Sequence, residues 1–173
     1  MKKGLLIVNT GNGKGKSTAA FGTMLRAVGQ GLHVCVVQFV KGGWKYGELK
    51  AVERFRDLVD FFVIGKGFIF DDADKSEHRE AAQKAWEKAK EVIRSGNYGL
   101  IILDELTYII NYGFVPVEDI LEVLQNRDPA MHVIITGRKA HPDLLEAADL
   151  VTEMVEQKHP FHKGIKAQKG IEY

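Results

Sequence analysis

The stretch TGNGKGKST, residues 10–18, decides how this chain is expected to fold, and it follows an apolar run, LLIV, at residues 5–8. Glycines at positions 11, 13 and 15, followed by Lys16 and Ser17, are typical of a loop that holds phosphate. Glycines let successive backbone N–H groups converge on phosphate oxygens without obstruction by side chains. The usual pattern, G-x-x-x-x-G-K-[ST], has glycine where this chain has Thr10. The departure leaves open whether the loop serves hydrolysis or another chemistry.

The loop joins a predicted strand to a predicted helix that begins near Ser17, which is the context that a phosphate loop requires. The N-terminal end of that helix adds partial positive charge for an anion. Lys16 is expected to reach phosphate oxygens, and the Ser17 hydroxyl is expected to ligate Mg²⁺. The alternative, a flexible glycine turn with incidental lysines, does not explain the ordered succession of strand, glycines, GKS and helix. The residues predicted to contact the nucleotide here are Gly11, Asn12, Gly13, Lys14, Gly15, Lys16, Ser17 and Thr18.

A second apolar run, residues 100–103, ends in two carboxylates, Asp104 and Glu105. Parallel strands bring their C-terminal ends to the same edge of a sheet, so these groups are expected to face the phosphate loop. Mg²⁺ prefers hard oxygen ligands, and one or two carboxylates plus phosphate oxygens suffice to hold it. We therefore predict a Mg²⁺ site, with Mn²⁺ as an alternative, made by Ser17, Glu105 and Asp104. Glu105 is the favoured direct ligand, with Asp104 close by.

Short apolar runs alternate with helical patterns along the chain. Four runs, LLIV, VCVVQFV, LIIL and HVIIT, are nearly continuously apolar, as expected for strands that are covered on both faces. The predicted strands are residues 5–8, 34–40, 61–64, 100–103, 132–136 and 150–155. The predicted helices are residues 76–94, 117–124 and 141–148, besides the one after the loop. This order predicts one α/β domain over residues 1–173, a P-loop NTPase-like (RecA-like) three-layer sandwich whose mostly parallel sheet has helices on both faces.

The composition of the chain limits the classes of protein to which it can belong. A chain of 173 residues with 45% hydrophobic and 27% charged residues is typical of a globular protein with one sizeable core. The net charge of +1 provides no global field that would attract nucleic acid. No apolar run approaches the roughly 20 residues that span a bilayer. Cys35, the single cysteine, lies in an apolar run and is expected to be buried in a reducing compartment, so we expect a cytoplasmic protein.

Two segments have no regular pattern. Residues 65–74, GKGFIFDDAD, are predicted to form a loop or a short lid. Residues 157–173 form a basic tail, which is either solvated or part of the site.

Several separate stretches together resemble the ATP-dependent corrinoid adenosyltransferases of phosphate-loop type. They are TGNGKGKSTAAFGTMLRAVGQG, VVQFVKGGWKYGE, LDELTY, VIITGRKAHPDLLEAADLVTEM and KHPFHKGIKAQKGIEY, in that family's order. The resemblance implies that the cobalt(I) of a corrinoid attacks C5′ of ATP and that triphosphate leaves. It also implies that ATP lies in the loop in reversed orientation, with its α-phosphate where a hydrolase holds the γ-phosphate. A loop with Thr10 in place of the first glycine is compatible with such an altered site.

The resemblance also implies roles outside the loop. Arg26 corresponds to a family arginine near the nucleotide, with a surface helix arginine as the alternative. Phe68 and Phe70 match aromatic residues at the lower face of the corrinoid, where rings exclude the axial ligand and ease reduction to cobalt(I); core packing is their alternative. With Lys16 and Glu105, these two phenylalanines are the predicted catalytic residues. A flavodoxin-type electron donor and a homodimer are implied as well.

The chain also departs from the family pattern. Many relatives carry an N-terminal extension over the corrinoid, whereas the first strand here begins almost at Met1, so we expect the corrinoid site to be more open or closed by another segment.

Two other functions remain compatible with the motifs. A P-loop NTPase or small-molecule kinase would use the same fold and metal site, with Glu105 activating water or a hydroxyl. A non-catalytic ATP-binding regulator would have the same loop. Residues 1–173 do not distinguish complete cobalamin from a precursor such as cobinamide or cobyric acid a,c-diamide as the corrinoid.

Overall fold

The computed structural model describes residues 3–40, 47–65, 67 and 75–172, so the predicted aromatic residues Phe68 and Phe70 and most of the predicted lid lie outside the described residues. The strands are β1 (Leu6–Thr10), β2 (Val34–Gln38), β3 (Val59–Val63), β4 (Leu100–Asp104), β5 (His132–Thr136) and β6 (Leu150–Glu153). The helices are α1 (Lys16–Gly29), α2 (Gly47–Val52), α3 (Lys75–Ser95), α4 (Leu106–Asn111), α5 (Val117–Gln125) and α6 (Pro142–Ala147). Two 3₁₀ helices, η1 (Glu53–Phe55) and η2 (Pro160–Lys163), complete the described elements.

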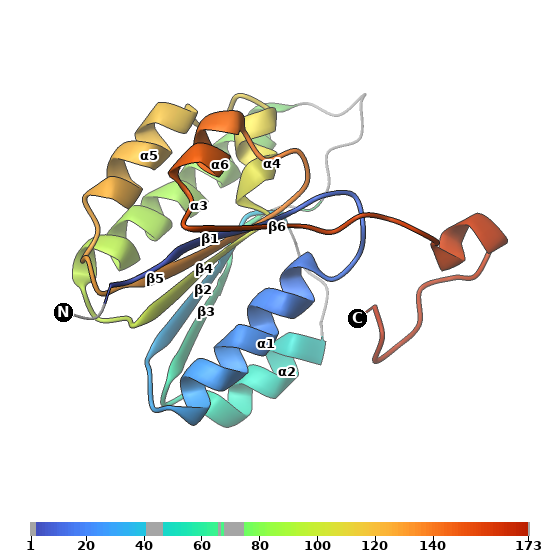
Figure 1. The fold of residues 1–173 in the computed structure, drawn as a ribbon, viewed down its shortest axis with the longest axis horizontal. Helices are drawn as coiled ribbons and strands as arrows, with labels where there is room; N and C mark the ends of the chain where they lie inside the picture. The colour runs from blue at the N-terminus through green and yellow to red at the C-terminus, as the bar shows by residue number, and fades with distance from the viewer. Residues whose placement is uncertain (1–2, 41–46, 66, 68–74, 173) are drawn as a thin grey trace.

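The six described strands form one sheet in the order β3-β2-β4-β5-β1-β6, and every neighbouring pair is parallel (Figure 1). The predicted α/β fold with a parallel sheet is confirmed. Strand β5 alone separates β1, which leads into the phosphate loop, from β4, which leads into the acidic pair. Since parallel strands end at one edge, Thr10, Asp104 and Thr136 all lie at the edge that carries the loop.

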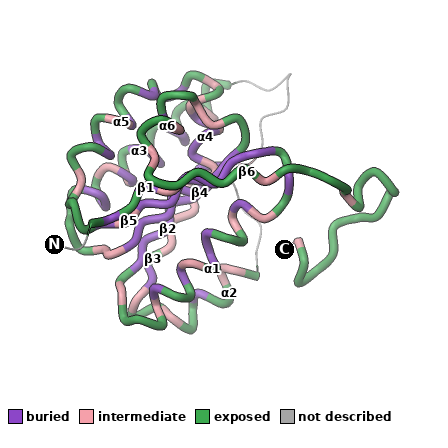
Figure 2. Tube along the Cα trace, in the orientation of Figure 1, coloured by how far each residue is buried: buried purple, intermediate pink, exposed green. Residues whose placement is uncertain are grey.

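Helices cover both faces of this sheet. Successive residues of a strand point to opposite faces, and the two core clusters take alternate residues of β2 and β4. Helices α1 and α2 contribute to the cluster that contains Val36 and Ile102, whereas α3, α4, α5 and α6 contribute to the one that contains Val37 and Leu103. Figure 2 shows the buried strands between these two helical layers, with the exposed edge strand β6 at one side.

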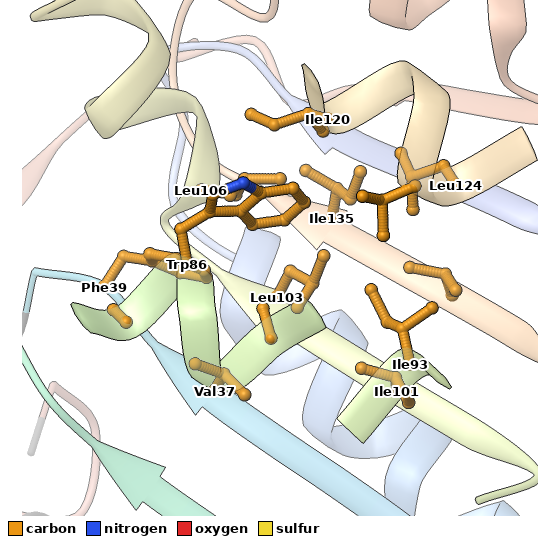
Figure 3. Close-up of a cluster of buried hydrophobic side chains, with 14 of the residues drawn as sticks. Val37, Phe39, Trp86, Ile93, Ile101, Leu103, Leu106, Ile120, Leu124 and Ile135 are labelled. Atoms are coloured by element: carbon orange, nitrogen blue, oxygen red, sulfur yellow. The ribbon is translucent and has the colours of Figure 1, made fainter. Parts of the chain in front are cut away.

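The larger core cluster forms around Trp86 of α3. This side chain is 3% exposed and lies among Phe39, Leu103, Leu106 and Ile135 (Figure 3). Full burial of each such apolar side chain contributes about 1.5–3 kcal/mol. The periodic apolar face of α3 thus packs the helix against the sheet.

The bounds of some strands and helices differ from the predicted bounds, because a buried apolar residue need not be paired in the sheet and a paired residue need not be buried. Phe39 and Val40 are buried in the core but lie beyond the end of β2, so the apolar run is longer than the strand. Strand β3 begins at Val59, earlier than predicted, because the exposed Asp60 interrupts the apolar pattern of this edge strand. Strand β6 ends at Glu153 because the next residue, Met154, turns its carbonyl to the phosphate loop. Helices α2 and α4, six residues each, were not predicted, whereas α6, also six residues, lies within the predicted range 141–148.

Cys35 is free and fully buried, as predicted, and burial raises the pKa of its thiol to about 12. Among the described residues, no helix has the length and apolar character needed to cross a membrane.

Candidate active site

The loop between β1 and α1 has the backbone of a phosphate loop, and a neighbouring strand constrains it. Gly11 and Gly15 have φ angles of 96° and 110°, which a residue with a side chain adopts only with strain. The N–H of Gly13 donates to the carbonyl of Met154 over 2.7 Å. A Cβ atom on Gly11 would lie 2.4 Å from that carbonyl oxygen, and one on Gly13 would lie 2.7 Å from it. Glycine is therefore required here both by the conformation and by the close approach of Met154.

Thr10 occupies the position of the usual first glycine and makes a tertiary contact that glycine cannot make. It is buried, and its hydroxyl accepts a hydrogen bond of 3.2 Å from the N–H of Ala140. Its carbonyl accepts from the N–H of Met154 over 2.9 Å. The residue thus ties the start of the loop to the segment after β5 and to the end of β6.

Lys16 is a buried cation at the start of α1. Its side chain is folded back, and Nζ donates to the carbonyl of Gly13 over 2.7 Å. Burial lowers the pKa of Lys16, an effect that the Glu105 carboxylate opposes and the Arg138 guanidinium reinforces. The buried Asn9 amide donates to the Lys16 carbonyl over 3.3 Å and holds the first turn of the helix. The predicted lysine and the predicted acidic residue are therefore electrostatic neighbours in the structure.

Asp104 lies at the end of β4, where it ties three strand ends together. Its side chain is 0% exposed. One carboxylate oxygen accepts from the Gln38 amide over 2.8 Å, and the other accepts from the Thr136 hydroxyl over 2.7 Å. Hydrogen bonds to a charged group are worth more than neutral ones, about 1.5–3 kcal/mol each. Both oxygens of Asp104 are thus used inside the protein, between β2, β4 and β5.

Glu105 has a different environment from its neighbour. It is half-buried, and it adopts a left-handed conformation, with φ 62° and ψ 28°, directly before α4. Such a conformation is uncommon for a residue other than glycine and often occurs at functional sites. Its N–H donates to the Thr136 hydroxyl over 2.9 Å, so the residue that binds Asp104 also holds the backbone of Glu105. Of the two predicted carboxylates, Asp104 is enclosed and Glu105 is the more exposed.

The other predicted site residues that the structure describes lie on the loop or the first turn of α1, except Arg26. Asn12, Lys14 and Thr18 are exposed on the loop and the first turn of α1, and Ser17 is half-buried there. Arg26 is not brought to the loop: it lies ten residues beyond Lys16 on α1, about 15 Å along the helix axis. There it borders a pocket with Leu5 and His132, near the starts of β1 and β5. Its contact with the nucleotide stays a prediction.

Four residues of the site were missed in the sequence. They are Gln38, Thr136, Arg138 and Met154. Thr136 is a polar residue at the C-terminal end of an apolar strand, the same signal that identified Asp104. Gln38 gave no such signal, because the apolar run 34–40 places it inside the predicted strand, whereas β2 ends at this residue. Arg138 is the second residue after β5 and could have been found by the same rule as Thr136. Met154 has no comparable signal, because its backbone and not its side chain bonds the loop.

Comparison with known proteins places this chain in one family. The model of the family described as "ATP:corrinoid adenosyltransferase BtuR/CobO/CobP" matches residues 2–173. The chain belongs to this family. A corrinoid adenosyltransferase of Sinorhizobium sp is 47% identical over 174 residues, which cover 99% of this chain and 81% of that protein. The corrinoid adenosyltransferase of Escherichia coli (strain K12) is 45% identical over 172 residues, 99% of this chain and 87% of that protein.

A solved structure supports the fold of this adenosyltransferase family member independently. The flagellar accessory protein FlaH from Methanocaldococcus jannaschii matches with a TM-score of 0.62 over 88% of this chain and 72% of that chain. At 13% identity, the likeness concerns the fold alone. The family resemblance and the transferase class that the sequence predicted are confirmed, and neither the NTPase or kinase nor the regulator is favoured. The roles of individual site residues in this adenosyltransferase remain predictions.

Proposed function

We propose that the chain transfers the 5′-deoxyadenosyl group of ATP to cobalt(I) of a corrinoid and releases triphosphate. The observation that carries the proposal is the buried Lys16 within the glycine loop, beside Glu105, in a chain that matches the adenosyltransferase family over residues 2–173. A buried cation interacts strongly with an anion because little water screens it. The site therefore suits a reaction in which negative charge develops on a phosphate group.

The chemistry breaks one bond and forms one. The cobalt(I) electron pair forms a bond to C5′, and the C5′–O bond breaks so that its electrons remain on the oxygen bridging to the α-phosphate. Negative charge grows on that oxygen, and catalysis is strongest where donors meet the charge that develops. Lys16 and the N–H groups of the glycine loop are the donors that we assign to this task. The assignment requires ATP in the reversed orientation, with the α-phosphate near Lys16.

We propose Mg²⁺ as the metal, with Mn²⁺ as an alternative. The site offers hard oxygen donors, which are the ligands that these ions prefer. Ser17 and Glu105 would hold the metal, because both are partly accessible. Asp104 would support Glu105, because its own oxygens bond Gln38 and Thr136. When bound, the ion would supply positive charge to the phosphate oxygens.

Phe68 provides a test of the reductive half of the proposal. By the family resemblance, Phe68 and Phe70 contact the lower face of the corrinoid and exclude its axial ligand, which eases reduction of cobalt(II). The Phe68→Ala variant is expected to react normally with chemically prepared cobalt(I) but poorly when the reaction starts from cobalt(II) and a mild reductant. Rates from the two starting states, measured side by side, check this. An equal loss in both would make Phe68 a packing residue.

Three further features belong to the same proposal. A flavodoxin-type protein is the electron donor that the resemblance implies, and the active species is a homodimer. The cytoplasm is the proposed compartment, since the free and buried Cys35 suits a reducing environment. Copurification with a reduced flavodoxin and sedimentation at several protein concentrations test the first two.

Product analysis is the experiment that tests the proposed function. The protein is incubated anaerobically with Mg-ATP and cob(I)alamin, and the products are separated in dim light. Light-sensitive adenosylcobalamin and triphosphate in equal amounts support the proposal. Release of ADP or orthophosphate without adenosylcobalamin would support the NTPase or kinase, and bound ATP without turnover would support the regulator. A crystal structure with ATP would add its direction, and a γ-phosphate against Lys16 with a water in line behind it would refute the proposal.

A further inference from the structure

The segment 154–172 contacts the phosphate loop at both of its ends. At the start, the Met154 carbonyl accepts from the N–H of Gly13 over 2.7 Å. The chain then passes through η2 and returns toward the start of α1 (Figure 1). At the far end, a carboxylate oxygen of Glu172 lies 2.5 Å from Nζ of Lys14. The predicted basic tail is therefore folded back onto the loop.

This segment bonds two groups of the loop, the N–H of Gly13 and Nζ of Lys14. Both are hydrogen-bond donors of the kind that bind phosphate. Backbone N–H groups and lysines of a glycine loop are the groups that hold polyphosphate. Glu172 and the Met154 carbonyl supply oxygen acceptors to them in the structure described here. A single carboxylate carries less charge than a triphosphate, so it is a weaker competitor for the same cation.

The far end of the segment has a defined structure but a weak attachment. The N–H of Gln168 donates to the second carboxylate oxygen of Glu172 over 2.7 Å, and the Gln168 carbonyl accepts from Ile171 and Glu172. Ile171 nevertheless remains 75% exposed, although residues 170–172 form one wall of a pocket of about 410 Å³ with α1 and α2. Exposed ion pairs contribute little to stability. A segment held in this way can leave the loop without unfolding the sheet.

The charge of Glu172 is maintained by its contacts. The hydrogen bond from Lys14, followed by that from the Gln168 backbone, lowers the pKa of the Glu172 carboxyl below its usual range. A glutamate carboxyl is ionised at neutral pH even at its ordinary pKa, so these contacts extend the charged state, which attracts Lys14, to lower pH.

We propose that Glu172 governs the exchange of polyphosphate at the loop by competing with it for Lys14. ATP displaces the carboxylate when it binds, and the carboxylate returns to Lys14 as triphosphate leaves. Because the returning carboxylate replaces a bond of the departing product, it lowers the affinity of the loop for triphosphate. Glu172 acts through Lys14 and is thus a positioning residue. The inference rests on the proposed function, since that function makes triphosphate the product.

The test is the binding of inorganic triphosphate to the full chain, without corrinoid, by titration calorimetry at low ionic strength. Glu172→Gln removes the competing charge and keeps the shape. Its Kd for triphosphate is expected to fall about two- to fivefold, which is the range for an exposed ion pair. The dissociation rate, measured by displacement, is expected to fall by a similar factor.

Two controls make the result specific. Glu156→Gln removes another carboxylate of the segment, one that bonds His162 over 2.7 Å, and is expected to leave the Kd unchanged. In a Lys14→Ala background, which itself binds triphosphate more weakly, Glu172→Gln is expected to have no further effect, because the two residues act on each other. An unchanged or weaker affinity in Glu172→Gln, an equal gain in Glu156→Gln, or a gain that persists without Lys14 would overturn the proposal.

The triphosphate-binding test and the turnover assay can fail independently of each other. If adenosylcobalamin forms but Glu172→Gln does not tighten triphosphate binding, the inference about Glu172 is wrong and the proposed function stands. If Glu172→Gln tightens binding but no adenosylcobalamin forms, competition at Lys14 stands and the proposed function is wrong.

Discussion

Replacement of Lys16 by alanine is expected to slow adenosyl transfer about 10²–10³-fold, the effect of losing a donor to a developing oxyanion, about 2.7–4 kcal/mol. The large effect follows from burial. Lys16 is 7% exposed, and water cannot readily replace its charge at the phosphate. The rate of adenosylcobalamin formation from excess cob(I)alamin, at saturating Mg-ATP, measures the loss.

Two control variants show whether the loss comes from the charge of Lys16, from the volume of its side chain, or from the removal of any lysine. Lys16→Met keeps much of the side-chain volume without the charge and is expected to be as slow as Lys16→Ala. Lys84→Ala, at an exposed lysine of α3 that pairs with Glu80, is expected to turn over normally. Near-normal turnover of Lys16→Ala, with Mg-ATP saturating, would remove Lys16 from the mechanism.

Replacement of Asp104 by alanine is expected to destabilise the fold by about 3–6 kcal/mol, because it breaks two buried hydrogen bonds to a charged group. The Gln38 amide and the Thr136 hydroxyl would be left without this acceptor. The ends of β2, β4 and β5 would then lose the side chain that joins them by hydrogen bonds. For a chain of this length, such a loss lowers Tm by about 10 °C. Thermal unfolding of the nucleotide-free protein measures it.

The neighbouring carboxylate provides the matched comparison. Glu105→Gln is expected to keep a near-normal Tm, because Glu105 is half-buried and its backbone bond to Thr136 remains. Its affinity for Mg-ATP, relative to metal-free ATP, is expected to fall by about 10–100-fold, as for the loss of groups around a metal. A normal Tm in Asp104→Ala, or an unaltered metal dependence in Glu105→Gln, would contradict the division of roles between the two residues.

Much of the fold was predictable from the sequence because burial on both faces of a parallel strand leaves a continuous apolar run. Strands β1, β2, β4 and β5 have this pattern, and each was found. The edge strand β3 was misplaced by two residues at its start, because the solvent-facing Asp60 breaks the pattern. Helices α2 and α4 were not predicted from the sequence, whereas the equally short α6 was predicted because it follows a glycine turn.

The site was predictable in part for a similar reason. The loop and the acidic pair each follow an apolar strand, so the rule that parallel strands end at one edge brings them together. The same rule extends to Thr136 but not to Gln38, which the apolar run 34–40 places inside a strand; both side chains hold Asp104. Nothing in the local sequence distinguishes the roles of Asp104 and Glu105, because the difference arises from which side chain the neighbouring strands cover.

The sequence alone determined that this chain forms a parallel α/β sheet with a phosphate loop and an acidic pair at one edge, and that it resembles corrinoid adenosyltransferases. These properties depend on local patterns, the continuous apolar run and the glycine spacing. Only the tertiary structure decided that Asp104 is enclosed while Glu105 is partly exposed, and that segment 154–172 returns to Lys14. The physical reason is that each of these depends on contacts between residues far apart in the chain, such as the 158 positions between Lys14 and Glu172.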